Sequence, residues 1–131
     1  MGNPLHILVV EDNPVNQKLL GLMLKQFGYT CVIAADGKIG VAEYRKGSFD
    51  AVLMDIQMPV MDGFEATAAI RAHERSNGGH IPIIAVTAHV MPGYREKCLE
   101  NGMDNYLAKP FKMQELKEII TETMQQRNAA S

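Results

Sequence analysis

Five side chains that could together carry out phosphoryl transfer each follow a short apolar run of the sequence. They are three carboxylates, a hydroxyl and an ammonium group: Glu11, Asp12, Asp55, Thr87 and Lys109. Carboxylates that lie close together repel one another, so the pKa of at least one rises unless a cation is present. Oxygen ligands without His or Cys suit a hard cation, above all Mg²⁺. The ammonium and hydroxyl groups can hold phosphate oxygens, and an Asp can accept phosphate covalently.

The apolar runs alternate with stretches of helical character five times along the chain. The expected strands are 5–10, 30–34, 51–54, 81–86 and 105–108, and the expected helices are 14–27, 36–46, 63–75, 92–101 and 112–126. The first, third and fourth runs are almost continuously apolar, which is typical of strands covered on both faces. The alternation predicts a single (βα)5 α/β domain, with right-handed crossovers and a parallel sheet covered by helices on both faces.

The number of strands favours, by analogy, the flavodoxin-like strand order 2-1-3-4-5. In such a sheet the five chemical side chains share the carboxyl edge, where ligands bind in this class of fold. Each residue also has an ordinary interpretation, as a turn residue, a helix cap or an acidic group near a helix N-terminus. A functional site requires all five residues to lie at the same edge of the sheet. Five unrelated turn or capping residues would have no reason to share that edge.

Length and composition limit the classes of function. The chain has 131 residues, is 47% hydrophobic and carries a formal net charge of -2. We expect one domain over residues 1–131, with a core from about 5 to 125 and frayed ends. The near-balanced charge gives no reason to expect nucleic acid or direct membrane contact. No apolar run approaches the roughly 20 residues of a membrane helix, and no secretory signal is visible. Cys31 and Cys98 have no metal-ligand spacing and suggest free thiols in a reducing cytoplasm.

Four motifs resemble the receiver domain of two-component response regulators. They are Val9-Val10-Glu11-Asp12-Asn13, the segment from Leu53 to Gly63, Val86-Thr87-Ala88, and Tyr106-Leu107-Ala108-Lys109-Pro110. The motifs occur in order and at suitable spacing, so the resemblance covers nearly the whole chain. Residues 11–17 look most like receivers attached to hybrid sensor histidine kinases. A hybrid kinase is therefore the expected parent, and a free-standing receiver is the alternative.

The resemblance implies a role for each acidic residue. Asp55 matches the phosphoacceptor, which receives a phosphoryl group from a phosphohistidine. Asp12 matches the direct Mg²⁺ ligand, and Glu11 matches the neighbouring acid that acts through water. The backbone carbonyl of Gln57 matches the third protein ligand, and Mn²⁺ could take the place of Mg²⁺. Because the domain would modify only itself, we do not expect an enzyme with turnover.

The resemblance also implies a conformational switch. Thr87 and Lys109 match the groups that hold phosphoryl oxygens, and Tyr106 matches the aromatic residue that turns inward when Thr87 moves toward the phosphate. The Lys109–Pro110 peptide bond matches one that is commonly cis. The ordinary alternative for Tyr106 is a half-buried strand residue whose hydroxyl lies in water.

The expected partner is a histidine kinase dimerisation and phosphotransfer domain or a histidine-containing phosphotransfer protein. Apolar residues of the helix expected over 14–27 sweep an arc of roughly 200°, whereas a core-facing stripe needs only about 100°. We therefore expect part of this helix to be exposed for docking, through Asn13, Val15, Asn16, Leu19 and Leu22. An equally weighted alternative is a helix buried on two sides.

Three other functions compete with this interpretation. A pseudo-receiver would keep the fold without phosphorylation, but every matched site residue is present. A phosphatase with an Asp nucleophile needs an acid two residues later, where this chain has Gln57. A flavin- or nucleotide-binding domain needs a glycine-rich phosphate cradle, which is absent after the first apolar run.

Overall fold

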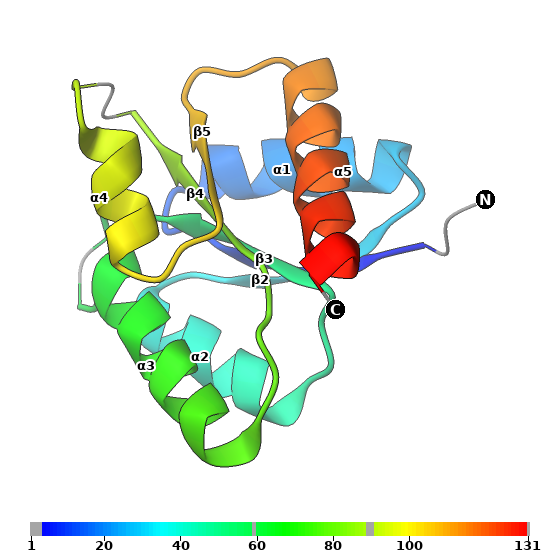
Figure 1. The fold of residues 1–131 in the computed structure, drawn as a ribbon. Coiled ribbons are helices and arrows are strands. Elements are labelled where there is room, and N and C mark those ends of the chain that lie inside the picture. The colour runs from blue at the N-terminus through cyan, green and yellow to red at the C-terminus, as the bar shows by residue number, and fades with distance from the viewer. Residues whose placement is uncertain (1–3, 59, 89–90, 131) are drawn as a thin grey trace.

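The structure is a computed structural model that describes residues 4–58, 60–88 and 91–130, so that Pro59 of the second motif lies outside it. Strands and helices alternate along this part of the chain (Figure 1). The strands are β1 (His6–Val10), β2 (Thr30–Ala34), β3 (Ala51–Asp55), β4 (Ile83–Thr87) and β5 (Asn105–Ala108). The helices are α1 (Pro14–Gln26), α2 (Gly37–Lys46), α3 (Gly63–Asn77), α4 (Tyr94–Glu100) and α5 (Met113–Ala130).

All neighbouring strands pair in parallel, in the order β2-β1-β3-β4-β5. The expected fold and strand order are therefore confirmed. β4 begins at Ile83 rather than at residue 81, because Pro82 has no N–H to donate to a neighbouring strand. At the other end of the chain, α5 continues to Ala130, beyond the helix end expected at residue 126.

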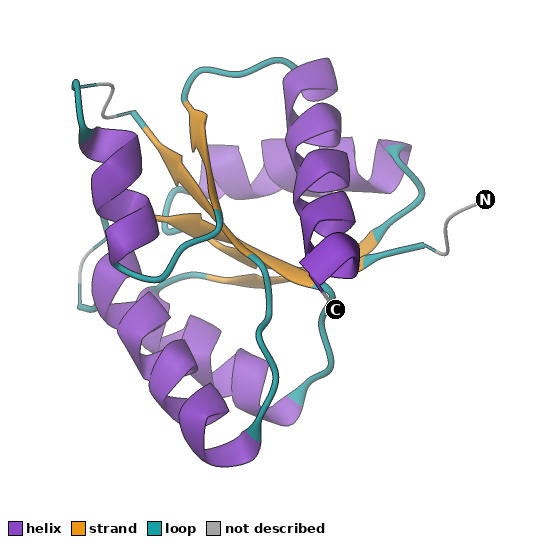
Figure 2. Cartoon of the chain, viewed as in Figure 1, coloured by secondary structure: helices purple, strands orange, loops and turns teal. Residues whose placement is uncertain are grey.

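The sheet separates two apolar layers, because alternate residues of each strand face opposite sides. From β1, Ile7 and Val9 join Leu20 of α1 and Leu116 of α5 in one layer. The intervening residues of β1 join residues of α2, α3 and α4 in the other layer. Figures 1 and 2 show the corresponding arrangement, with α1 and α5 on one face of the sheet and the other helices on the opposite face.

Side-chain caps fix the loops at the carboxyl edge of the sheet. Asn13 Oδ1 accepts hydrogen bonds from the N–H groups of Val15 at 2.8 Å and Asn16 at 3.2 Å, which starts α1 directly after β1. Asp62 and Glu65 form a reciprocal capping box at the start of α3. The caps therefore fix the points at which the loops after β1 and β3 enter α1 and α3.

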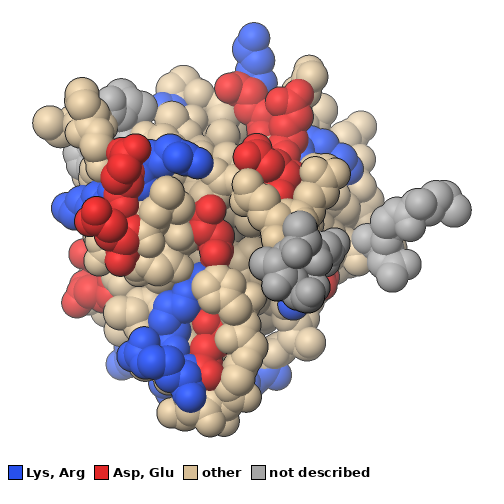
Figure 3. All heavy atoms as spheres, in the orientation of Figure 1, with Lys and Arg blue, Asp and Glu red and all other residues tan. Residues whose placement is uncertain are grey.

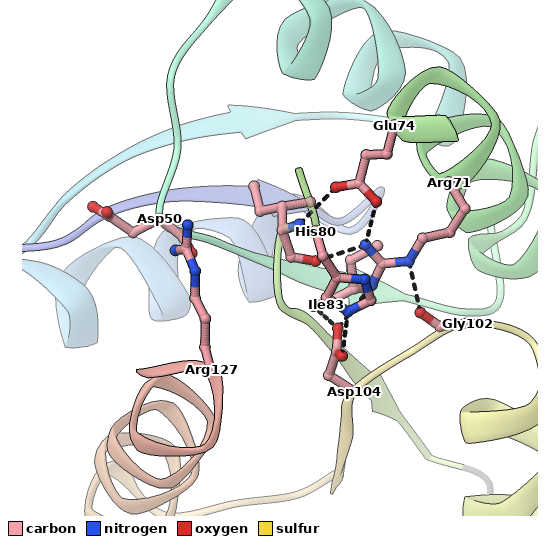
Figure 4. Close-up of polar contacts among 9 residues, drawn as sticks. Asp50, Arg71, Glu74, His80, Ile83, Gly102, Asp104 and Arg127 are labelled. Carbon is pink, nitrogen blue, oxygen red and sulfur yellow. Dashed lines mark hydrogen bonds and ion pairs between the residues drawn. The ribbon is translucent and has the colours of Figure 1, made fainter. Parts of the chain in front are cut away.

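Arg71 of α3 organises the opposite edge of the sheet (Figure 4). Its guanidinium group donates to the carbonyl oxygens of Gly102 at 2.9 Å and Ile81 at 2.8 Å. It also pairs with Glu74 and Asp104, each at 2.7 Å. These contacts join α3 to the loops that precede β4 and β5, so they fix the starts of two strands whose far ends carry site residues.

The surface agrees with the near-balanced composition. Figure 3 shows acidic and basic side chains interspersed over the visible face. Within the described ranges, no helix is both long and apolar enough to cross a membrane.

Candidate functional site

Three carboxylates meet where β1 and β3 end. Glu11, Asp12 and Asp55 each offer an oxygen, and these oxygens lie within 4.8 Å of one another. They meet because β1 and β3 are neighbours in the sheet and Asp55 is the last residue of β3. Glu11 is only 1% exposed and Asp55 only 6%. An all-oxygen set of this charge fits a hard divalent cation such as Mg²⁺.

Lys109 reaches this cluster from the loop after β5. Its Nζ lies 2.9 Å from Glu11 Oε1 and 3.6 Å from Asp55 Oδ1. Its backbone N–H donates to the Thr87 carbonyl at 2.8 Å, and the Lys109–Pro110 peptide bond is cis, as the resemblance implies. The ammonium group therefore faces the two most buried carboxylates of the site.

Burial and the charge of nearby Glu11 together raise the pKa of Asp55 to about 7, and the Lys109 ammonium group offsets only part of this rise. Burial alone would also raise the pKa of Glu11, but hydrogen bonds from Lys109 and from the N–H of Asn13 outweigh it and lower this pKa. Asp55 is therefore only partly ionised near neutral pH, and a bound cation would favour its ionised form.

Contacts from Asn13, the cap of α1, and from Gln17 within α1 hold Glu11. The N–H of Asn13 donates to Glu11 Oε2 at 3.0 Å, and Gln17 Nε2 donates to the Glu11 carbonyl at 2.7 Å. Sequence reasoning assigned no role to Gln17. The sequence feature that could have indicated this contact is the position of Gln17 one helical turn after Asn13. That spacing brings the Gln17 side chain back toward the loop after β1.

Thr87 and Gln57 both lie close to Asp55. Thr87 is the last residue of β4 and is 1% exposed, while the neighbouring Val86 pairs with Asp55 across the sheet. The backbone of Gln57 forms a hydrogen bond with the Asp55 carboxylate, and the Gln57 side chain is exposed. The metal-ligand role of its carbonyl and the phosphate contact of Thr87 stay predictions.

Tyr106 is half-buried in β5 and contacts an aromatic residue that sequence reasoning missed. The ring of Tyr94, at the start of α4, lies edge-on to Tyr106 at 6.3 Å and tilted against Phe64 at 6.3 Å. Burial raises the pKa of Tyr94, and a hydrogen bond with Thr87 partly offsets this rise. Tyr94 therefore connects Thr87 with Tyr106, and its place near the start of the helix expected over 92–101 is the sequence feature that could have indicated it.

The exposed part of α1 lies beside the carboxylate cluster. Val15 is 74% exposed, Leu22 57% and Leu19 45%, so the alternative of a helix buried on two sides is wrong. Asn16 and Leu19 also line a small hollow of about 80 Å³ together with Lys109. Asn13 caps the helix. The docking role of these residues stays a prediction.

The structure thus combines a doubly wound parallel sheet with acids, a lysine and a threonine at its carboxyl edge, which is the arrangement that the four sequence motifs predict. The sequence model of the response regulator receiver domain family matches residues 7–121, and the chain belongs to this family. It is 49% identical over 122 residues to hybrid signal transduction histidine kinase I of Dictyostelium discoideum, covering 89% of this chain and 7% of that protein. It is 42% identical over 115 residues to the sensor protein GacS of Pseudomonas syringae pv. syringae, covering 87% and 13%. The chain thus spans a small part of these relatives.

Solved structures agree with the family. The receiver domain of the sensor histidine kinase PA1611 of Pseudomonas aeruginosa PAO1, with a magnesium ion in its active site cleft, superimposes with a TM-score of 0.83 and 48% identity. The alignment covers 93% of this chain and 98% of that one. The receiver domain of Ssk1 from Saccharomyces cerevisiae, crystallised with the histidine phosphotransfer protein Ypd1, has a TM-score of 0.89 and 31% identity, covering 97% and 93%. This chain is therefore a receiver domain of the kind used in phosphorelay signalling.

Proposed function

We propose that this receiver domain accepts a phosphoryl group from a phosphohistidine onto Asp55, with Mg²⁺ as cofactor, and that phosphorylation changes its conformation. The observation that carries the proposal is the cluster of Glu11, Asp12 and Asp55 facing the Lys109 ammonium group. A cluster of this charge repels a phosphoryl group unless a cation is bound, and it is suited to binding one.

Each residue of the site has its own role in the proposed reaction. An Asp55 carboxylate oxygen forms a bond to phosphorus as the phosphorus–nitrogen bond of the donor breaks, and the released imidazole takes up a proton. Lys109 and the Thr87 hydroxyl hold phosphoryl oxygens and stabilise their charge. Asp12, Asp55 and the carbonyl of Gln57 would hold the metal directly, and Glu11 would act through water. Mg²⁺, when bound, neutralises charge shared by the carboxylates and the phosphoryl oxygens.

The comparisons support this assignment and its partner. A receiver similar to this chain holds a magnesium ion in its active site cleft, and another was crystallised with a histidine phosphotransfer protein. The curated relatives include several hybrid kinases. We therefore propose a kinase phosphotransfer domain or a separate phosphotransfer protein as donor, a hybrid sensor kinase as parent, a cytoplasmic location, and self-modification without enzymatic turnover.

Phosphorylation is tested by measuring the intact mass of the protein after incubation with a small phosphodonor. We expect the gain of one phosphoryl group in Mg²⁺, no gain with a chelator, and no gain in Asp55→Ala. Glu100→Gln removes an exposed carboxylate of α4 and should be labelled normally. Beryllium fluoride distinguishes rapid hydrolysis from a pseudo-receiver, because it should bind to Asp55 stably. Absence of both labelling and beryllium fluoride binding would establish the pseudo-receiver.

The proposed switch is tested with Tyr106→Ala. Because Tyr106 packs against Tyr94, which contacts Thr87, we expect this variant to be labelled at Asp55 while α4 fails to respond. The measurement is the change in backbone amide NMR shifts of residues 94–108 on adding beryllium fluoride and Mg²⁺. Changes in these residues as large as in the wild type would remove Tyr106 from the mechanism.

Docking on α1 is tested with Val15→Glu and Leu22→Glu. Each places a charge on an exposed apolar position, so we expect transfer from a phosphorylated histidine donor to slow at least about tenfold. Labelling by a small phosphodonor should stay unchanged, because it needs no docking. Ile39→Glu is the matched control, since Ile39 is similarly exposed (43%) but lies on α2. Equal transfer rates in all three variants would count against docking on α1.

A further inference from the structure

The Asp12 carboxylate is held differently from the other two carboxylates of the cluster. Glu11 is paired with Lys109 at 2.9 Å, and the Lys109 ammonium group also lies 3.6 Å from Asp55. The Asp12 carboxylate, in contrast, forms no hydrogen bond or ion pair with any residue among 4–58, 60–88 and 91–130. Its position therefore depends on how the backbone of Asp12 is held.

One planar peptide unit lies on each side of the Asp12 Cα. The preceding unit carries the Glu11 carbonyl oxygen, which accepts a hydrogen bond from Gln17 Nε2 at 2.7 Å. The following unit carries the N–H of Asn13, which donates to Glu11 Oε2 at 3.0 Å. Because a planar peptide moves as one unit, these two hydrogen bonds limit the directions in which the Asp12 side chain can leave the backbone.

The preceding peptide unit depends on Gln17 in particular. Its other polar group is the N–H of Asp12, which has no hydrogen-bond partner within the described part of the chain. The N–H of Glu11 donates to the Ala34 carbonyl at 3.0 Å, but this group belongs to the peptide unit before. The hydrogen bond from Gln17 is therefore what sets the orientation of the peptide between Glu11 and Asp12.

Gln17 is itself fixed by the packing of α1. Its backbone N–H donates to the Asn13 carbonyl at 2.9 Å, which places it one helical turn after the cap. On the same helix, Leu20 is 3% exposed and Leu24 is fully buried, so α1 is anchored in the apolar layer beneath it. Gln17 thus links a helix that is fixed in the core with the loop that carries Asp12.

We propose that Gln17 is a positioning residue of the metal site, because its hydrogen bond to the Glu11 carbonyl holds Asp12 in the orientation that binds Mg²⁺. This inference rests on the part of the proposed function in which Asp12 is a direct metal ligand. Mg²⁺ demands near-ideal octahedral geometry, so a carboxylate that turns away lowers the affinity although its charge is kept. Groups that orient metal ligands typically contribute about 10- to 100-fold to metal affinity.

The test compares Mg²⁺ binding by the wild type and by Gln17→Met, in a titration with the metal alone that is followed by backbone amide NMR shifts. Methionine is similar in length to glutamine and is a good helix former, but its thioether cannot donate a hydrogen bond. We expect the dissociation constant for Mg²⁺ to rise at least about fivefold. Gln26→Met makes the same change at the exposed end of α1 and should bind Mg²⁺ as the wild type does.

The dependence of Asp55 labelling on Mg²⁺ separates positioning of a metal ligand from general damage to the site. In Gln17→Met, labelling by a small phosphodonor should need at least about fivefold more Mg²⁺ to reach half of its maximal rate. At saturating Mg²⁺ the rate should equal that of the wild type, because Asp55, Thr87 and Lys109 are unchanged. A rate that stays low at saturating Mg²⁺ would show general damage and overturn the positioning role.

This inference and the proposed phosphorylation fail in different ways. If Gln17→Met binds Mg²⁺ as tightly as the wild type and Gln26→Met do, the positioning role is overturned, whereas labelling of the wild type at Asp55 still supports the proposed function. If the wild type binds Mg²⁺ but neither phosphoryl group nor beryllium fluoride, the proposed phosphorylation is overturned. The comparison of Mg²⁺ affinities then still decides the role of Gln17.

Discussion

Asp55→Asn is expected to increase the free energy of unfolding of the metal-free domain by about 2 kcal/mol at pH 8. In the wild type at this pH the buried Asp55 carboxylate is ionised close to ionised Glu11, whereas the amide carries no charge. A pKa raised from 3.8 to about 7 corresponds to roughly 4 kcal/mol, and sharing of the proton within the pair reduces this figure.

The stabilisation that Asp55→Asn gives relative to the wild type should become smaller as the pH falls. Because the pKa of Asp55 is higher in the folded than in the unfolded chain, the folded wild type binds the extra proton between about pH 4 and 7. The stability of the wild type therefore falls as the pH rises through this window, and the asparagine variant lacks this loss. The pKa of Glu11 is lowered in the folded chain, so the contribution of Glu11 to the stability of the fold is lost only at more acidic pH.

Urea unfolding in chelator at pH 5, 6, 7 and 8 measures this effect. Glu100→Gln, an exposed carboxylate on α4, should change stability by less than about 0.5 kcal/mol at every pH. Adding Mg²⁺ should stabilise the wild type more than Asp55→Asn, because the variant has lost a charged ligand. A gain for Asp55→Asn that is equal at pH 5 and pH 8 would show that charge repulsion is not its cause.

Gly63→Ala is expected to destabilise the domain by about 3 kcal/mol and to weaken Mg²⁺ binding. A Cβ at residue 63 would lie 2.6 Å from the Asp55 carbonyl oxygen and 2.7 Å from Ile56 Cα. Both atoms belong to the backbone and cannot rotate away, and the N–H of Gly63 already donates to the Ile56 carbonyl at 2.9 Å. The end of β3 would have to move, which would displace the Asp55 carboxylate.

Gly21→Ala provides the control for Gly63→Ala. A Cβ at Gly21 would meet its nearest neighbour, Ile33 Cδ1, at an ordinary 3.7 Å. Since Gly21 lies inside α1, alanine should stabilise the helix by about 0.5–1 kcal/mol. Urea unfolding and Mg²⁺ titration of both variants measure the contrast. Similar stability of the two variants would mean that the loop after β3 accommodates the added methyl group.

The residues at the ends of the strands could be predicted because position in a parallel sheet follows from the alternation of strands and helices. Glu11, Asp55 and Thr87 lie at one edge for that reason, and Lys109 reaches it from the loop after β5. The exposure of Val15 could be suspected but not decided, because helical periodicity does not show which neighbours cover a face.

Contacts between side chains far apart in sequence could not be predicted. Arg71 meets Asp104 only because α3 and the loop before β5 are packed at the same end of the sheet. The contact between Tyr94 and Tyr106 likewise depends on how α4 lies against β5. Spacing within a segment carries no information about either pair, since their geometry is set by packing of whole elements.

The position of the sheet between two separate apolar layers has a consequence for how receivers diversify. Leu20 and Leu24 of α1 belong to one layer, and Ile70 of α3 belongs to the other. Substitutions that share no contacts usually have additive effects on stability. Substitutions on the outer face of α1, where we propose that the histidine donor docks, can therefore leave the aromatic residues around Tyr94 across the sheet undisturbed. The proposed docking surface and the proposed switch can then change independently of one another within one small domain.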